Sequence, residues 1–126
     1  VRIEQREWKS YQDMMSKLGN EITTGGWIGD YPDPTTFLDN WKKGDGNNST
    51  GWSSEEYEKL LGKAELATDP AERIKLLRQA ETIFLNEHPI VPIYWHTSVY
   101  LLHNSVKNWH PLPLRNQPYK FLDLEK

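Results

Sequence analysis

The sequence predicts a domain of the α/β class, in which helices flank a mixed sheet. Two observations favour this class. The first thirty residues pass from a strand-like to a helix-like and back to a strand-like pattern, which is typical of a βαβ unit. Near residue 90, a β-branched and aromatic run follows two long helical patterns. The length of 126 residues fits a single domain.

The N-terminal part supplies the first of these patterns. Residues 1–5 alternate between apolar and polar side chains, which predicts a short strand. Gly19 is expected to end the next helix in the left-handed conformation. Residues 21–29 look extended and predict a second strand. The helix between the strands is predicted by apolar residues at spacings of three or four, namely Trp8, Tyr11, Met15 and Leu18.

Three capping signals predict the helices of the middle part. Asp33 is an N-cap followed by proline at the first helical position. Ser53 with Glu56, and Asp69 with Glu72, have the spacing of capping boxes. The charged residues of the last helix, including "ERIK", are expected to face solvent. Its apolar stripe, which we interpret as packing, consists of Ile74, Leu77, Ala80, Ile83 and Phe84.

The remaining segments are a polar loop and a β-branched tail. The loop "KKGDGNNSTG" is expected to be the most mobile segment, and it holds a formal glycosylation sequon at Asn48-Ser49-Thr50. The run "IVPIYWHTSVYLLH" predicts one or two strands interrupted at Pro92. The tail is expected to wrap over a folded part, because it is broken by Pro111, Pro113 and Pro118.

Composition and spacing argue against several functions. The net charge is −3 with no basic patch, which argues against a nucleic-acid partner. The chain has no apolar run of 18 residues and no cysteine, so we expect no membrane span, disulfide or thiol chemistry. The sequence also lacks phosphate-loop and serine-nucleophile motifs. No metal or other cofactor is expected, because the spacing of seven between His96, His103 and His110 is not that of a ligand set.

A cluster of acids among aromatic rings is the part of the sequence most suggestive of function. Asp30, Asp33 and Asp39 could form the paired carboxylates of a glycosidase-like enzyme. Asp33 is already explained as a cap, whereas Asp30 stands between Gly29 and Tyr31 with no such role. A charge in apolar surroundings needs a partner. That partner is either a group within the protein, such as an arginine or backbone N–H groups, or a ligand cation.

Two stretches resemble a known family. They are "GGWIGDYPDPTTFL" and "SSEEYEKLLGKAELATDPAERIKLLRQAETIFLNEHPIVPIYW". Both are similar to the C-terminal part of the bacterial extracellular solute-binding proteins of family 5, the peptide-binding receptors of ABC importers. The resemblance covers nearly the whole chain. It rests on GW-x-x-DY-x-x-P, on D-P-A-E-R and on I-V-P-I-Y, which occur in the family's order.

The resemblance implies a periplasmic-binding-protein-like fold of class II, and a chain that is a fragment of a longer receptor. Residues 1–91 would belong to one ligand-binding lobe, and residues 92–126 would return toward the other lobe. Tyr94 and Trp95 would then mark the crossing, or simply pack in a strand. The receptor would work outside the cytoplasm and perform no catalysis. Its partners would be an oligopeptide ligand and the permease subunits, with a lipid anchor on the parent protein instead of a membrane span.

The resemblance also implies a ligand site. Asp30 would pair with the α-ammonium group of a bound peptide, and Trp27 would line the pocket. The backbone around Gly26 and Ile28 would run beside the peptide like an added strand. Two further candidates for the pocket lining are Tyr31 and Trp52.

One residue departs from the pattern of some oligopeptide receptors. Thr24 stands where they have an arginine that can meet a peptide carboxylate. The residues that would hold the C-terminus of the ligand are therefore not predicted. Other branches of the family carry nickel complexes, haem or oligosaccharides. An oligosaccharide-binding receptor of the same architecture is therefore the main alternative, and a glycosidase-like enzyme using Asp30 and Asp33 is the second.

Overall fold

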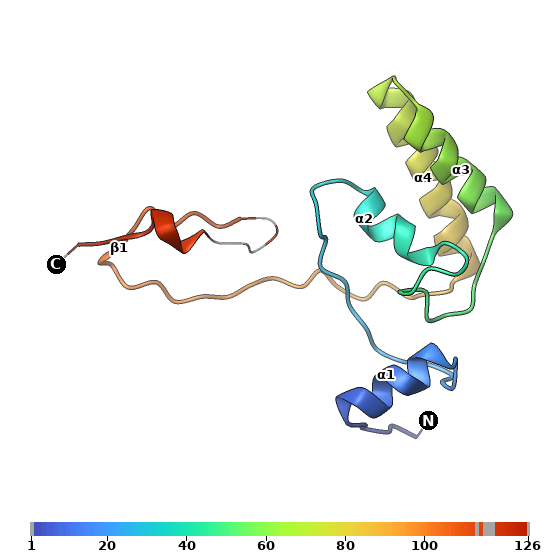
Figure 1. The fold of residues 1–126 in the computed structure, drawn as a ribbon, viewed down its shortest axis with the longest axis horizontal. Helices are drawn as coiled ribbons and strands as arrows, with labels where there is room; N and C mark the ends of the chain where they lie inside the picture. The colour runs from blue at the N-terminus through green and yellow to red at the C-terminus, as the bar shows by residue number, and fades with distance from the viewer. Residues whose placement is uncertain (1, 113, 115–117, 126) are drawn as a thin grey trace.

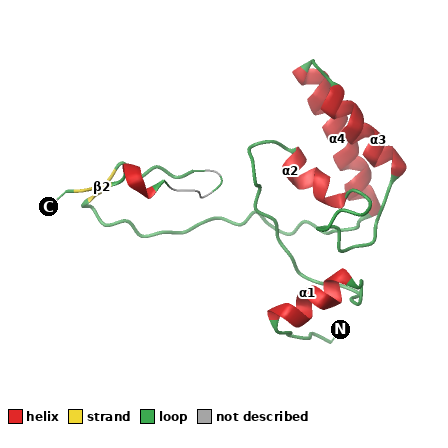
Figure 2. Cartoon of the chain, in the orientation of Figure 1, coloured by secondary structure: helices red, strands yellow, loops and turns green. Residues whose placement is uncertain are grey.

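The computed structural model describes residues 2–112, 114 and 118–125, so Val1 and Pro113 lie outside the described residues. In this part of the chain the structure combines helices with one small antiparallel sheet (Figure 2). The elements in chain order are α1 (Trp8–Ser16), α2 (Thr35–Leu38), the 3₁₀ helix η1 (Asp39–Trp41), α3 (Glu55–Leu66), α4 (Pro70–Glu87), β1 (Val106–Lys107), the 3₁₀ helix η2 (Tyr119–Phe121) and β2 (Asp123–Leu124).

Helices α3 and α4 form a hairpin and lie side by side (Figure 1). The predicted start of α4 is confirmed, because the Asp69 carboxylate accepts the N–H groups of Ala71 and Glu72. The predicted box at Ser53 is wrong by one residue. Ser54 is the N-cap of α3, and its hydroxyl accepts the N–H of Tyr57 at 3.4 Å.

The hydrophobic core lies between this hairpin and α2. Its centre is Tyr57, which is fully buried and donates its hydroxyl to the carbonyl of Leu38 at 2.6 Å. Phe84 packs against the rings of Trp41 and Trp52, with centroids 5.1 and 5.3 Å away. The predicted stripe of α4 is confirmed at three positions, while Ile74 is 38% exposed. The buried hydrophobic residues of the described chain are Leu38, Tyr57, Leu61, Ala64, Leu77, Ala80 and Phe84.

The loop between η1 and α3 is held by one asparagine. The side-chain amide of Asn48 donates to the carbonyls of Trp41, Lys42 and Trp52 at 2.9 to 3.2 Å. These bonds satisfy carbonyls at the end of η1 and before α3. The nitrogen that a glycan would modify is therefore engaged, and Asn48 is a structural residue of the loop.

The predicted strands at 1–5, 21–29 and 90–103 are wrong for the described residues, because these segments form no ladder and no βαβ unit arises. The described sheet contains only β1 and β2, paired antiparallel with Val106 opposite Leu124. A strand is stable only when neighbouring strands pair its backbone. The segments have the side-chain pattern of strands, but no partner among the described residues.

Helix α1 is confirmed, although its end differs from the prediction. The left-handed residue is Leu18, with φ of 52°, and not Gly19. Residues of α1 are exposed or half-buried, and Trp8 is 67% exposed. The apolar face that predicted this helix therefore has little to pack against in the described chain.

Beyond α4 the chain leaves the helices and runs as an extended segment toward the β1–β2 pair (Figure 1). Residues 91–104 are exposed, including Val91, Ile93 and Trp95 at 74 to 87%. None of the described helices is long and apolar enough to cross a membrane. The division into lobe segments at residue 92 stays a prediction.

Candidate functional site

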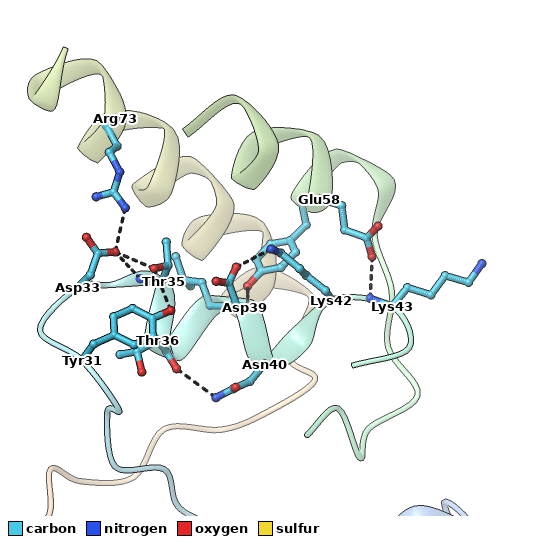
Figure 3. Close-up of polar contacts among 12 residues, drawn as sticks. Tyr31, Asp33, Thr35, Thr36, Asp39, Asn40, Lys42, Lys43, Glu58 and Arg73 are labelled. Carbon is cyan, nitrogen blue, oxygen red and sulfur yellow. Dashed lines mark hydrogen bonds and ion pairs between the residues drawn. The ribbon is translucent and has the colours of Figure 1, made fainter. Parts of the chain in front are cut away.

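The candidate site is the loop that precedes α2. Trp27, Ile28 and Tyr31 expose 40, 58 and 41% of their surface, and Gly26 and Asp30 are also exposed. The hydroxyl of Tyr31 lies 3.2 Å from that of Thr35 in α2 (Figure 3). Five of the six predicted site residues thus lie in one accessible loop.

The backbone of this loop is open. Among the described residues, no hydrogen bond involves the main chain of residues 25–29. A Cβ placed on Gly25 or Gly26 would meet no atom within 4 Å. Since backbone polar groups need partners, water or a ligand must satisfy them here. The space beside Gly25 and Gly26 is therefore open in the described structure.

The carboxylate of Asp30 is accessible. The prediction that apolar surroundings enclose it is wrong for the described residues, because Asp30 is exposed there. No ion pair or hydrogen bond to this carboxylate occurs within the described residues. Its backbone N–H donates to the hydroxyl of Thr36 at 2.9 Å. The backbone at Asp30 is therefore anchored while its charge is available.

Asp33 has a different role, which the sequence explained only in part. Its carboxylate accepts from the N–H and the hydroxyl of Thr35 at 3.0 and 2.8 Å, so its capping role is confirmed although α2 is assigned from Thr35. It also pairs with Arg73 of α4 at 2.9 Å (Figure 3). The Arg73 guanidinium, followed by the Thr35 N–H, holds the pKa of Asp33 well below its usual range.

Arg73 is the residue that sequence reasoning missed. The charges of "ERIK" were expected on the solvated side of α4, yet the Arg73 side chain is only 28% exposed. The partner lies 40 positions away, and no local pattern reveals such a pair. The available signal was that Arg73 falls in the first turn of a helix, near the point where the hairpin can meet α2.

Trp52 lies on the core and not in the loop of the site. Its ring meets Tyr57 and Phe84 edge-on at 5.0 and 5.3 Å, and its indole N–H donates to Glu87 at 2.7 Å. These contacts give Trp52 a packing role in the described structure. Tyr94 and Trp95, the predicted crossing residues, are 77 and 87% exposed in the extended segment.

The described residues contain no group of three or more side chains suited to hold a metal ion. They also argue against one role for Asp33 in the enzyme alternative, that of the proton donor. A glycosidase needs one carboxylic acid that stays protonated, which requires a raised pKa. The pKa of Asp33 is lowered instead, because Arg73 and Thr35 stabilise its ionised form.

Comparison with known proteins finds binding proteins among the relatives of this chain. It is 38% identical over 108 residues to the oligopeptide-binding protein OppA of Bacillus subtilis (strain 168), which covers 85% of this chain. It is 30% identical over 125 residues, 99% of the chain, to the dipeptide-binding protein DppE of the same organism. The chain is a homologue of bacterial peptide-binding proteins. The predicted resemblance to the family 5 solute-binding proteins is thereby confirmed.

Two further findings limit what this homology shows. No family model matches the chain. The chain spans about a fifth of the length of the curated relatives it matches, 20% of OppA and 22% of DppE. A third relative, 31% identical over 92% of this chain and matched over 21% of its own length, is the probable deoxycholate-binding periplasmic protein YgiS of Escherichia coli (strain K12). Homologues of this chain thus differ in the ligands their names state.

Proposed function

We propose that this chain is part of an extracytoplasmic peptide receptor, the substrate-binding component of an ABC importer. The receptor would bind oligopeptides by their α-ammonium group and backbone, and deliver them to the permease subunits. The single observation that carries the proposal is that Asp30, whose exposed carboxylate has no partner among the described residues, directly follows the open backbone of residues 25–29. The relatives named for oligopeptide and dipeptide binding support the same ligand class.

Recognition of the peptide backbone would follow from the open backbone of residues 25–29. An extended peptide can add to an unpaired segment by main-chain hydrogen bonds, which every peptide can form whatever its sequence. Gly26 leaves space for this approach, and Ile28 supplies main-chain groups two residues further along. Trp27 would form an apolar wall beside the ligand, and Tyr31 would extend it.

Recognition of the amino end follows from the charge. An ammonium group placed at Asp30 would form a charge-assisted hydrogen bond. Closure of the rest of the receptor over the loop would remove water and strengthen this pair. Loss of one partner from a buried, hydrogen-bonded charge pair typically costs about 2–5 kcal/mol.

Location and anchoring are further parts of the proposal. Several relatives are named as periplasmic proteins, which supports a site of action outside the cytoplasm. A lipid anchor on the parent receptor would keep it at the membrane without a spanning helix. Binding and release, with no chemical step, would be its complete task.

An oligosaccharide ligand is the main alternative. The rings of Trp27 and Tyr31 are 40 and 41% exposed, and such rings can pack against the apolar face of a sugar. A bile acid such as deoxycholate is a second alternative, favoured by the name of one relative. A bile acid carries a carboxylate, which Asp30 would repel, so this ligand predicts a gain in affinity when Asp30 is neutralised.

Titration of the receptor that contains this chain with a tripeptide pool tests the proposal. We expect saturable binding in the wild type and in Glu21→Gln, which removes an exposed carboxylate from the same region. Asp30→Asn should weaken binding by roughly 30-fold or more, since about 2 kcal/mol corresponds to that factor. Unchanged peptide affinity in Asp30→Asn would refute the proposal that Asp30 binds the ammonium group of the peptide. Binding of an oligosaccharide or deoxycholate by the receptor, without binding of peptide, would favour the alternatives.

A further inference from the structure

The carboxylate of Asp30 is exposed, so a second group must fix its direction if it is to bind an ammonium group well. Binding sites hold their charged groups in place before the ligand arrives, because ordering them on binding lowers affinity. The side chain of Asp30 has no partner among the described residues. Among the described residues, Asp30 is anchored by the bond from its backbone N–H to the Thr36 hydroxyl, at 2.9 Å.

Thr36 is suited to act as a fixed anchor. It is 4% exposed, and it lies in α2 next to the core residue Leu38. Its carbonyl accepts the side-chain amide of Asn40 at 3.2 Å, which ties the same residue to the end of α2 and η1. A β-branched side chain in a helix has few rotamers, so its hydroxyl points in a defined direction.

The residue before Asp30 is held against the same anchor. A Cβ placed on Gly29 would lie 3.1 Å from the Thr36 methyl group and 3.3 Å from the ring of Phe37. Both distances are shorter than ordinary van der Waals contact. Glycine at this position therefore lets the backbone approach α2 closely enough for the Asp30 N–H to reach the hydroxyl.

The far end of the turn is fixed independently. Asp33 accepts from Thr35 and pairs with Arg73, which ties the end of the turn to α2 and α4 (Figure 3). The turn from Gly29 to Asp33 is thus attached on both sides, and the exposed Asp30 lies between the two attachments. An internal arginine, one of the partners expected for Asp30, binds Asp33 instead.

We propose that Thr36 is a positioning residue for ligand binding, which holds the backbone that carries the Asp30 carboxylate in place through its hydrogen bond to the Asp30 N–H. Thr36 does not touch the ligand. This inference rests on the proposed function, because it assigns Thr36 a role in binding the peptide ammonium group. It also makes a prediction about the Asp30 amide that requires no ligand.

The test compares two substitutions in the receptor that contains this chain. Thr36→Val keeps the branched shape and removes the hydroxyl, whereas Thr36→Ser keeps the hydroxyl. We expect Thr36→Val to weaken tripeptide binding about tenfold and to speed hydrogen exchange of the Asp30 amide. Thr36→Ser should retain affinity within about threefold. Thr82→Val is the matched control, because it removes a hydroxyl from an exposed position of α4.

Mass spectrometry of peptides covering Asp30 measures the exchange, and calorimetry measures the affinity for trialanine. Gly29→Ala is a second variant, which should push the turn from α2 and weaken binding at least threefold even if Thr36→Val fails to fold. Unaltered Asp30 exchange in Thr36→Val, or unchanged affinity in both Thr36→Val and Gly29→Ala, would overturn the inference.

The Asp30→Asn variant separates this inference from the proposed function. If Asp30→Asn loses affinity and Thr36→Val does not, ammonium binding by Asp30 is supported and the positioning role of Thr36 is refuted. If Asp30→Asn keeps full affinity, the proposed function fails, and the positioning role for ligand binding fails with it. Faster exchange of the Asp30 amide would then report the hydrogen bond alone.

Discussion

At the scale of single residues, the two neighbouring acids of the motif have opposite roles. Asp33 is committed to Thr35 and Arg73, while Asp30 offers its carboxylate to solvent. Sequence reasoning separated them correctly, because a cap is a local pattern and Asp30 fitted none. It expected burial around Asp30, however, and burial depends on parts of the fold that a local pattern does not specify.

Asn48 gives the first prediction. Asn48→Asp keeps the shape of the side chain but replaces its donor with a carboxylate facing three carbonyl oxygens. We expect the free energy of unfolding to fall by about 1–3 kcal/mol, because three half-buried hydrogen bonds lose their donor. Urea denaturation measures this change. Ser49→Ala, one residue away, should stay within about 0.5 kcal/mol of the wild type, and an equal effect of both would contradict the structural role of Asn48.

At the scale of elements, the helices were predictable and the sheet was not. The starts of α3 and α4 are encoded within a few residues by capping side chains and by apolar spacing. Strands depend on partners far away in the chain, and those partners are absent from the described residues for 21–29 and 90–103. Contacts such as Asp33 with Arg73, which join one element to another, likewise leave no local pattern.

The ion pair between Asp33, before α2, and Arg73 of α4 predicts a pH dependence of stability. Pairing lowers the pKa of Asp33 in the folded chain from an ordinary value of 3.8. The ionised carboxylate therefore stabilises the fold above the unfolded pKa, and this contribution is lost as the pH falls toward the folded value. Asp33→Asn should be less stable than the wild type by about 0.5–1 kcal/mol at pH 7, because a partly exposed ion pair is screened by solvent.

The difference between wild type and Asp33→Asn should persist down to about pH 5 and shrink below it. Urea unfolding at a series of pH values measures it. Asp69→Asn is the control, because Asp69 caps α4 but makes no ion pair among the described residues. A stability difference that stays constant down to pH 2 would show that the charge of Asp33 is not the cause.

At the scale of the whole molecule, the chain presents one wall of the proposed site and a long exposed segment at residues 91–104. Ligand pockets enclose roughly 70–90% of a small ligand, whereas the loop at Trp27 and Asp30 is open. The chain also spans about a fifth of its peptide-binding relatives. Both observations favour a site that other parts of a longer receptor complete.

The 126 residues alone are therefore expected to bind peptides weakly. We predict a dissociation constant above about 1 mM for trialanine, since a single exposed ion pair contributes about 1 kcal/mol or less. Calorimetric titration with trialanine, of the isolated chain and of the longer receptor in parallel, measures the difference in affinity. Micromolar binding by the isolated chain would show that it holds a complete site, and would contradict the assignment of these residues to one lobe.

The central claim is that Asp30 recognises the amino end of a peptide. Calorimetric titration of wild-type receptor and Asp30→Asn with trialanine and N-acetyl-trialanine tests it most directly, because acetylation removes the ligand charge and leaves the backbone unchanged. We expect acetylation to weaken wild-type binding by about 30-fold or more, and Asp30→Asn to bind both ligands with equally low affinity. A preference for trialanine over N-acetyl-trialanine that is as strong in Asp30→Asn as in the wild type would contradict this role of Asp30.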